Sequence, residues 1–169
     1  MSLVIPETNA LPNFTWEKPL IEYIYNQWSI PDPAKPATYP SNDEISFRVG
    51  FFDFFRPYEV NVLFISETPT WWDSGKRRVW LQDVVQVWLR MQRIERDAVS
   101  VDPQLSQMEF EIIRIAMQYQ RSPQAIGGIK ELTYAGRNRP YEVTDDHTNT
   151  DWRSTITLNL TYEIQNMQP

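Results

Sequence analysis

The spacing of apolar residues divides most of the chain into strands and helices. Strict alternation of apolar with polar residues predicts strands over 59–66, 79–93 and 152–165, and a short apolar run predicts another over 129–134. In 79–93 the apolar residues also fit a helical stripe, but dense β-branched and aromatic residues favour the strand. The segment 45–55 is expected to form a short strand or a buried loop.

Two amphipathic helices are expected. The first spans 17–28, where Thr15 is placed to cap it and Pro19 falls in the first turn. The second starts at Asp102-Pro103 and ends before Ser122-Pro123. Its predicted core face carries Leu105, Met108, Ile112, Ile115, Ala116 and Tyr119. Its predicted wet face carries Gln104, Gln107, Glu111, Arg114, Gln118 and Arg121.

These elements predict an α+β fold, with a mixed or antiparallel sheet of about four strands and two main helices packed on it. Seven of the 13 prolines fall within the first forty residues. Residues 1–44 are therefore expected to be an extended proline-rich arm that contains one helix and packs on the core. The remainder, 45–169, is expected to be a single domain. Two polar segments are predicted as loops, 67–78 and 135–150, the second with a loose hairpin as the alternative.

Composition narrows the chemistry available to this chain of 169 residues. Cysteine is absent, which excludes disulfides, thiolate nucleophiles and cysteine-ligated zinc. The net charge of −6 disfavours binding to a phosphate backbone unless a local basic face overrides it. No apolar run is long enough for a membrane span or a signal-peptide core, so a soluble chain without membrane contact or cleaved signal is expected.

Few residue patterns suggest a catalytic centre. The single histidine, His147, lies beside Asp145, Asp146 and Asp151, but one imidazole in a polar loop is more typical of a solvated residue than of a metal ligand. Metal-dependent nucleases use converging acids, often with a nearby lysine, and the candidates here are Asp53, Glu59, Glu67 and Lys76. The spacing of these residues matches no recognisable nuclease motif. Five glycines provide no phosphate-binding loop. We therefore expect no enzyme activity and assign no catalytic, cofactor-binding or metal-ligating residue.

Four segments carry a resemblance to a known family: VVQVWLRMQR, DPQLSQMEFEIIRIAMQY, GGIKELTY and DWRSTITLNLTYEI. Their order resembles that of the tail-terminator and tail-to-head joining proteins of long-tailed viruses of bacteria and archaea. Those proteins have an α-β-β-α-β-β layout and a last strand that starts near an Arg and alternates to the C-terminus. The resemblance covers roughly 58–165. The proline-rich arm and the FFDFF segment depart from it.

The resemblance implies an assembly role without turnover. Subunits would form a homo-oligomeric ring, commonly a hexamer, that caps the tail tube and presents a docking surface to the head connector or neck proteins. DNA would pass through without sequence-specific binding, and the protein would reside in the virion tail or neck after assembly in the host cytoplasm. Loop aromatic and basic residues are then the expected protein interface: Trp71, Trp72, Lys76, Arg77, Arg78, Tyr141 and Trp152.

Two other classes of function stay open. One is a non-viral α+β binding module that uses the Trp- and Arg-rich loop around 71–78 for a peptide or a nucleic-acid strand. The other is a small metal-dependent hydrolase built on the acids around His147. The first predicts a monomer with salt-sensitive binding, and the second predicts activity that depends on Asp145, Asp146 or His147.

Overall fold

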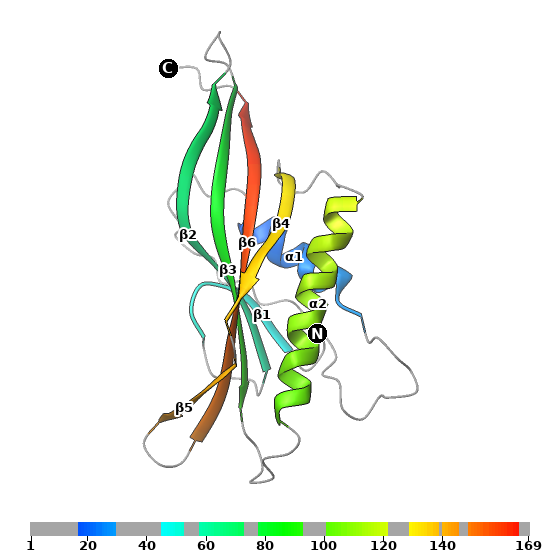
Figure 1. Ribbon diagram of the computed structural model, residues 1–169, viewed down its shortest axis with the longest axis vertical. Helices are drawn as coiled ribbons and strands as arrows, with labels where there is room; N and C mark the ends of the chain where they lie inside the picture. The colour runs from blue at the N-terminus through cyan, green and yellow to red at the C-terminus, as the bar shows by residue number, and fades with distance from the viewer. Residues whose placement is uncertain are drawn as a thin grey trace.

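A computed structural model describes residues 17–29, 45–52, 58–72, 78–92, 101–121, 129–138, 140–145 and 149–165. Two helices and six strands follow one another along the described part of the chain (Figure 1). They are α1 (Glu17–Gln27), β1 (Ile45–Val49), β2 (Tyr58–Trp72), β3 (Arg78–Gln92), α2 (Val101–Arg121), β4 (Ile129–Arg137), β5 (Tyr141–Asp145) and β6 (Asn149–Gln165). The predicted α+β class is confirmed.

The strands form one mixed sheet in the order β1-β2-β3-β6-β4, and β5 also pairs with β6. Among these described pairings, β1 and β2 run parallel and the others are antiparallel. The sheet therefore has six strands and not about four. β1 confirms the short strand that was one of the two alternatives for 45–55, over its first five residues. β5 is also five residues long, and so short a strand carries too few alternating positions to stand out in a polar segment.

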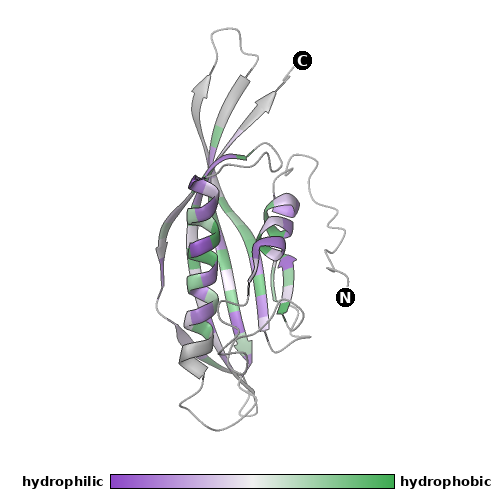
Figure 2. Cartoon of the chain, turned by 90° about the vertical axis from the view of Figure 1, so that its right-hand side faces the viewer, coloured by the Kyte–Doolittle hydropathy of each residue, from purple (hydrophilic) through white to green (hydrophobic). Residues whose placement is uncertain are grey.

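Both helices cover the same face of the sheet. α1 packs on β1 and β2, while α2 packs on β4, β6 and β3. Figure 2 shows both helices on the viewer's side of the strands. The helices lie over the middle and one end of the sheet, and β2, β3 and β6 continue past them as a three-stranded ribbon (Figure 1). We call the side opposite these two helices the back face.

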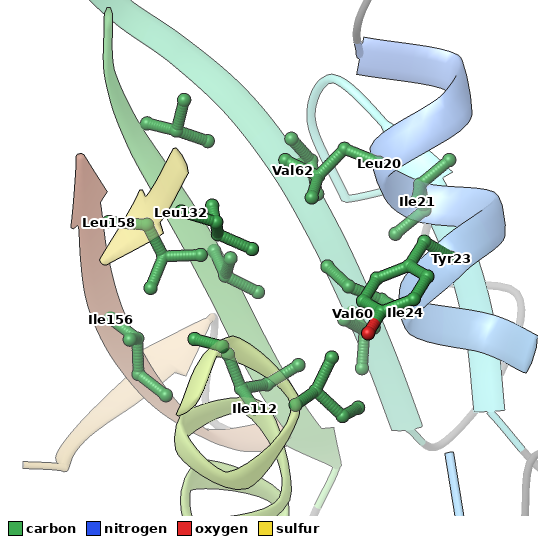
Figure 3. Packing of buried hydrophobic residues seen from close by; sticks show 14 of the residues in the cluster. Leu20, Ile21, Tyr23, Ile24, Val60, Val62, Ile112, Leu132, Ile156 and Leu158 are labelled. Carbon is green, nitrogen blue, oxygen red and sulfur yellow. The ribbon is translucent and has the colours of Figure 1, made fainter. Parts of the chain in front are cut away.

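The core lies between the helices and the sheet. In Figure 3, Leu20 and Ile24 of α1 face Val60 and Val62 of β2. Ile112 of α2 lies over a second group of fully buried side chains: Val85, Val87, Leu89, Leu132, Ile156, Leu158 and Leu160. All the residues predicted on the core face of the second helix are buried. Alternation along three long strands thus supplies a continuous apolar surface for two helices.

The second strand does not end where the sequence predicts. β2 does not stop at residue 66 but runs through Pro69 to Trp72. Register shifts between Phe64 and Ser66 and between Pro69 and Trp71 let the ladder with β3 continue, since a bulge accommodates a proline that has no N–H to donate. The predicted loop over 67–78 is therefore wrong for 67–72.

The predicted loop over 135–150 is also wrong in part. β4 extends to Arg137, and β5 pairs with the first residues of β6, so the hairpin alternative is the correct one for 141–145. Gly136 has a φ of 152° at a register shift of β4, a conformation that side chains with a Cβ rarely adopt. The strand prediction for 79–93 and the helix prediction for 17–28 are confirmed to within one residue at each end. The rest of the predicted arm lies outside the described residues.

We predict that Ile156→Ala lowers the free energy of unfolding by about 2–5 kcal/mol, because Ile156 is fully buried in the central part of β6. Urea unfolding of the variant measures the loss. Ile65→Ala is the matched control, since Ile65 lies in β2 with 46% of its surface exposed, and it should cost under about 1 kcal/mol. Equal losses in the two variants would contradict the assigned core.

Candidate functional site

The back face carries a buried ion network centred on Arg90 of β3. Its Nη1 donates to Glu59 Oε1 of β2 at 2.7 Å. Its Nε and Nη2 donate to the two oxygens of Asp151 in β6 at 2.8 and 2.9 Å. The three side chains are almost fully buried. One guanidinium therefore joins the three central strands through a bidentate pair and a second carboxylate.

The Arg90 network binds two of the acids that the sequence offers as candidate site residues. Glu59 belongs to the nuclease-like set and Asp151 to the acids around His147, yet both carboxylates are held by Arg90 inside the sheet. Glu67, another member of that set, accepts a hydrogen bond from the Tyr162 hydroxyl at 2.7 Å, on the ribbon end of β2. Glu59 and Asp151 thus meet only through Arg90, and Glu67 is bound elsewhere on the sheet. Asp53, Lys76, Asp146 and His147 lie outside the described residues.

Phe52, in the described start of the β1–β2 connection, lies on the back face. Parallel pairing places Val49 beside Val62 and Ile45 beside Tyr58, so the chain must return along the sheet between the two strands. Phe52 packs against Trp88, 5.9 Å between ring centroids, and Arg153 lies 5.4 Å from the Phe52 ring. Since Trp88 alternates with the core residues of β3, Phe52 lies on the side opposite the helices. Phe52 thus contacts Trp88 and Arg153, and Arg153 pairs with Arg90 in the sheet.

A polar joint holds the end of α1 on α2. Glu111 accepts hydrogen bonds from the Ser29 backbone N–H at 2.7 Å and from the Ser29 hydroxyl at 3.0 Å. Arg114 binds Glu111 and also donates to the Gln27 carbonyl at 2.6 Å, where a cation satisfies a terminal carbonyl of α1. The sequence predicts Glu111 on the wet face of the helix. That prediction is wrong, because the end of α1 packs over Glu111 and buries it. Burial also raises the pKa of Tyr23 in α1, an effect that the nearby Arg114 charge partly opposes.

A second joint holds α2 on the sheet. Glu109 is buried and accepts hydrogen bonds from Arg137 Nη1 at 2.6 Å and from the Ser154 hydroxyl. The Arg137 guanidinium also lies over the Phe110 ring, 5.5 Å from its centroid. The two acids of α2 between residues 105 and 121 are therefore both buried and bound, and they fix the helix against α1, β4 and β6.

The outer side of α2 presents an apolar stripe. Phe110 is 62% exposed and Met117 is 48% exposed, and the half-buried Ile113 lies between them at helical spacing. A shallow hollow of about 530 Å³ runs along these residues and is also lined by Arg114, Gln118 and Arg121. We call Phe110, Ile113 and Met117 the α2 stripe. Exposed large apolar side chains that share one helix face indicate a surface for a partner.

The β5–β6 hairpin presents a second exposed aromatic ring. Tyr141, the first residue of β5, is 48% exposed and pairs with Arg153 of β6. In Figure 1, β5 lies at the lower left, diverging from the body of the sheet, whereas α2 lies on the right. Tyr141 is one of the predicted interface residues, and its exposure leaves its ring available for such a contact.

The structure separates the other predicted interface residues. Trp71 and Trp72 lie at the end of β2, opposite Trp80 and Val79 of β3, and Arg78 opens β3 opposite Gln165. They mark the ribbon end of the sheet and not a loop beside its core. Lys76 and Arg77 lie outside the described residues. Trp152 is half-buried and packs against the core, so part of its ring is used inside the subunit.

The sequence prediction missed the α2 stripe. Its signal was present, because the segment FEIIRIAM holds more apolar residues than one core face of a helix accommodates. A surplus of apolar residues at positions 110, 113 and 117 indicates a second, outward stripe.

Within the described ranges, no group of three or more His, Cys, Asp or Glu side chains is placed to hold a metal ion. Neither described helix combines the length and the apolar character needed to cross a membrane. No protein-family model matches the chain, and no curated protein matches it. The placement of its own residues therefore carries the functional argument.

We predict that Arg90→Met lowers the free energy of unfolding by about 3–5 kcal/mol, because it leaves the carboxylates of Glu59 and Asp151 buried without their cation. Arg90→Lys should recover only part of the loss, since an ammonium keeps the charge but cannot form the bidentate pair. Urea unfolding at one protein concentration makes the comparison.

The control is Arg121→Met at the exposed end of α2, which should change the free energy of unfolding by under about 0.5 kcal/mol. A loss of under about 1 kcal/mol for Arg90→Met would show that the network contributes little to the fold.

Proposed function

We propose that the protein is a structural virion component. In this proposal it is a ring-forming tail terminator or neck component that caps the tail tube and joins it to the head connector. The observation that carries the proposal is that its buried charged side chains and its exposed apolar side chains have different roles. The buried carboxylates of Glu59, Asp151, Glu109 and Glu111 bind arginines that hold the fold, while exposed apolar side chains lie on α2 and on the β5–β6 hairpin. Such a surface suits assembly better than turnover.

The order of elements supports the same proposal. Without the short strands β1 and β5, the chain reads α1-β2-β3-α2-β4-β6, which agrees with the α-β-β-α-β-β layout of the proteins it resembles. The last strand has Arg153 near its start and alternates over most of its length, also in agreement. β1 is the added part at the front of the domain.

The ends of the sheet are suitable docking points for other virion proteins. The ribbon of β2, β3 and β6 extends beyond the helices, and Trp71, Trp72 and Arg78 lie on its last residues (Figure 1). The β5–β6 hairpin projects from the other end. Long antiparallel pairing of β2, β3 and β6 makes the ribbon stiff, so partner residues placed on it are held in position before binding. The net charge of −6 would keep passing DNA from adhering to the ring.

We predict that the purified chain forms a closed oligomer with a mass of about 120 kDa, six times the 20.1 kDa subunit, at micromolar concentration. Light scattering over a range of protein concentration and salt measures the mass. A closed ring should keep a constant mass as concentration rises, whereas an open assembly would keep growing.

A strict monomer at every concentration and salt would contradict the proposal. Salt-sensitive binding of single-stranded nucleic acid, lost when Lys76, Arg77 and Arg78 are replaced by Ser, would instead favour the binding module. The triple variant should have the mass of the unchanged chain if the ring proposal is correct and these residues serve only other partners.

A further inference from the structure

We infer that the α2 stripe binds an amphipathic helix of a second protein, one that carries carboxylates beside its own apolar stripe. The inference goes beyond the proposed ring and does not depend on it. Three observations carry it: the exposed apolar side chains of α2, the internally bonded backbone beneath them, and the sign of the charge at their border.

The α2 stripe is a continuous apolar surface. Phe110 and Met117 are both exposed, and the seven residues between them correspond to about 10 Å along the helix axis. The half-buried Ile113 lies between them, and the hollow of about 530 Å³ follows all three side chains. A single exposed apolar residue is ordinary, but three on one helix face, lining one hollow, indicate a partner.

The backbone of α2 determines what kind of segment fits this surface. The N–H and C=O groups in the middle of a helix bond to one another, so α2 offers a partner side chains alone. An extended segment laid on the stripe would leave its own backbone groups unbonded over the apolar centre, which is costly. A helix brings its backbone groups already paired, and its side chains fit between those of another helix. The occupant is therefore a helix.

The border of the stripe is cationic, in a chain whose net charge is −6. The side chains that line the hollow include Arg114 and Arg121 and no acid. Arg114 is paired with Glu111, but that carboxylate is buried, so solvent meets the guanidinium side of the pair. Arg121 is exposed and forms no ion pair with the described residues. Carboxylates on a partner would supply the complementary charge.

Arg121 also favours one direction of the bound helix. It is the last residue of α2, at the end where the helix dipole is negative. Asp and Glu are enriched in the first turn of helices, where the dipole is positive. An antiparallel partner places its acidic first turn beside Arg121. A parallel partner would place that turn near Phe110, where Arg137 is already paired with the buried Glu109. The partner helix therefore runs antiparallel to α2.

Two labelled synthetic peptides test the inference on the full chain by fluorescence anisotropy. Both are helices of about 18 residues with leucines spaced as one apolar stripe. The acidic peptide carries Glu beside the stripe in its first two turns, and the basic peptide carries Lys at the same positions. The acidic peptide should bind about tenfold more tightly at low salt, and high salt should reduce this difference.

Three variants locate the surface. Met117→Asp places a carboxylate in the apolar centre and should weaken binding of the acidic peptide by about tenfold. Arg121→Glu should reverse the preference, so that the basic peptide binds more tightly. Ile65→Asp is the matched control and should bind both peptides like the unchanged chain. Ile65 has 46% of its surface exposed against 48% for Met117, and it lies in β2, which α2 does not contact. Circular dichroism should be the same for all three variants.

Equal affinity for the two peptides, or no binding of either below about 1 mM, would overturn the inference. Unchanged affinity in Met117→Asp would do the same. Tighter binding of a single-stranded DNA oligonucleotide than of the acidic peptide, lost in Arg121→Glu, would also overturn it, because the surface would then serve nucleic acid. If the chain has the mass of a ring but binds neither peptide, this inference fails and the ring proposal stands. A monomer that binds the acidic peptide selectively supports this inference and contradicts the ring.

Discussion

The guanidinium of Arg90 is the interaction on which the sheet depends. It lies on the back face of β3, near the end of that strand, and it binds acids from both neighbouring strands. A charge buried there is tolerated because the carboxylates of Glu59 and Asp151 bind it. The pairing also favours one register, because a slip of β2 or β6 by one residue would send its carboxylate to the helix side. The long strands are thereby held in one alignment.

A fixed alignment has consequences for the helix side. With β3 in register, the core residues of three strands form one surface, and α1 and α2 each bury a stripe on it. Glu109 and Glu111 then fix α2 from below, and this leaves its outer stripe directed to solvent. The bonds of the buried acids Glu109 and Glu111 therefore determine which side of α2 faces solvent. We regard this rigidity as the property that an assembly subunit requires.

Sequence reasoning predicted what depends on local spacing. Alternation identified β3 and β6, and the proline at the start of α2 marked its first turn. Proline also misled, because Pro69 suggests the end of a strand that in fact continues past it on a bulge. The Arg90 network could not be predicted from local spacing, since the partners of Arg90 are 31 and 61 residues away in sequence and only the fold brings them together. The partner of Glu111 was hidden for the same reason: Ser29 is 82 residues away.

The most direct measurement of the central claim is electron microscopy of the purified protein in negative stain. If the chain is an assembly subunit, class averages should show closed rings with a central hole and one fixed rotational symmetry, and the number of subunits should agree with the solution mass. Particles of subunit size, or compact oligomers with no hole, would contradict the claim that this chain builds a ring.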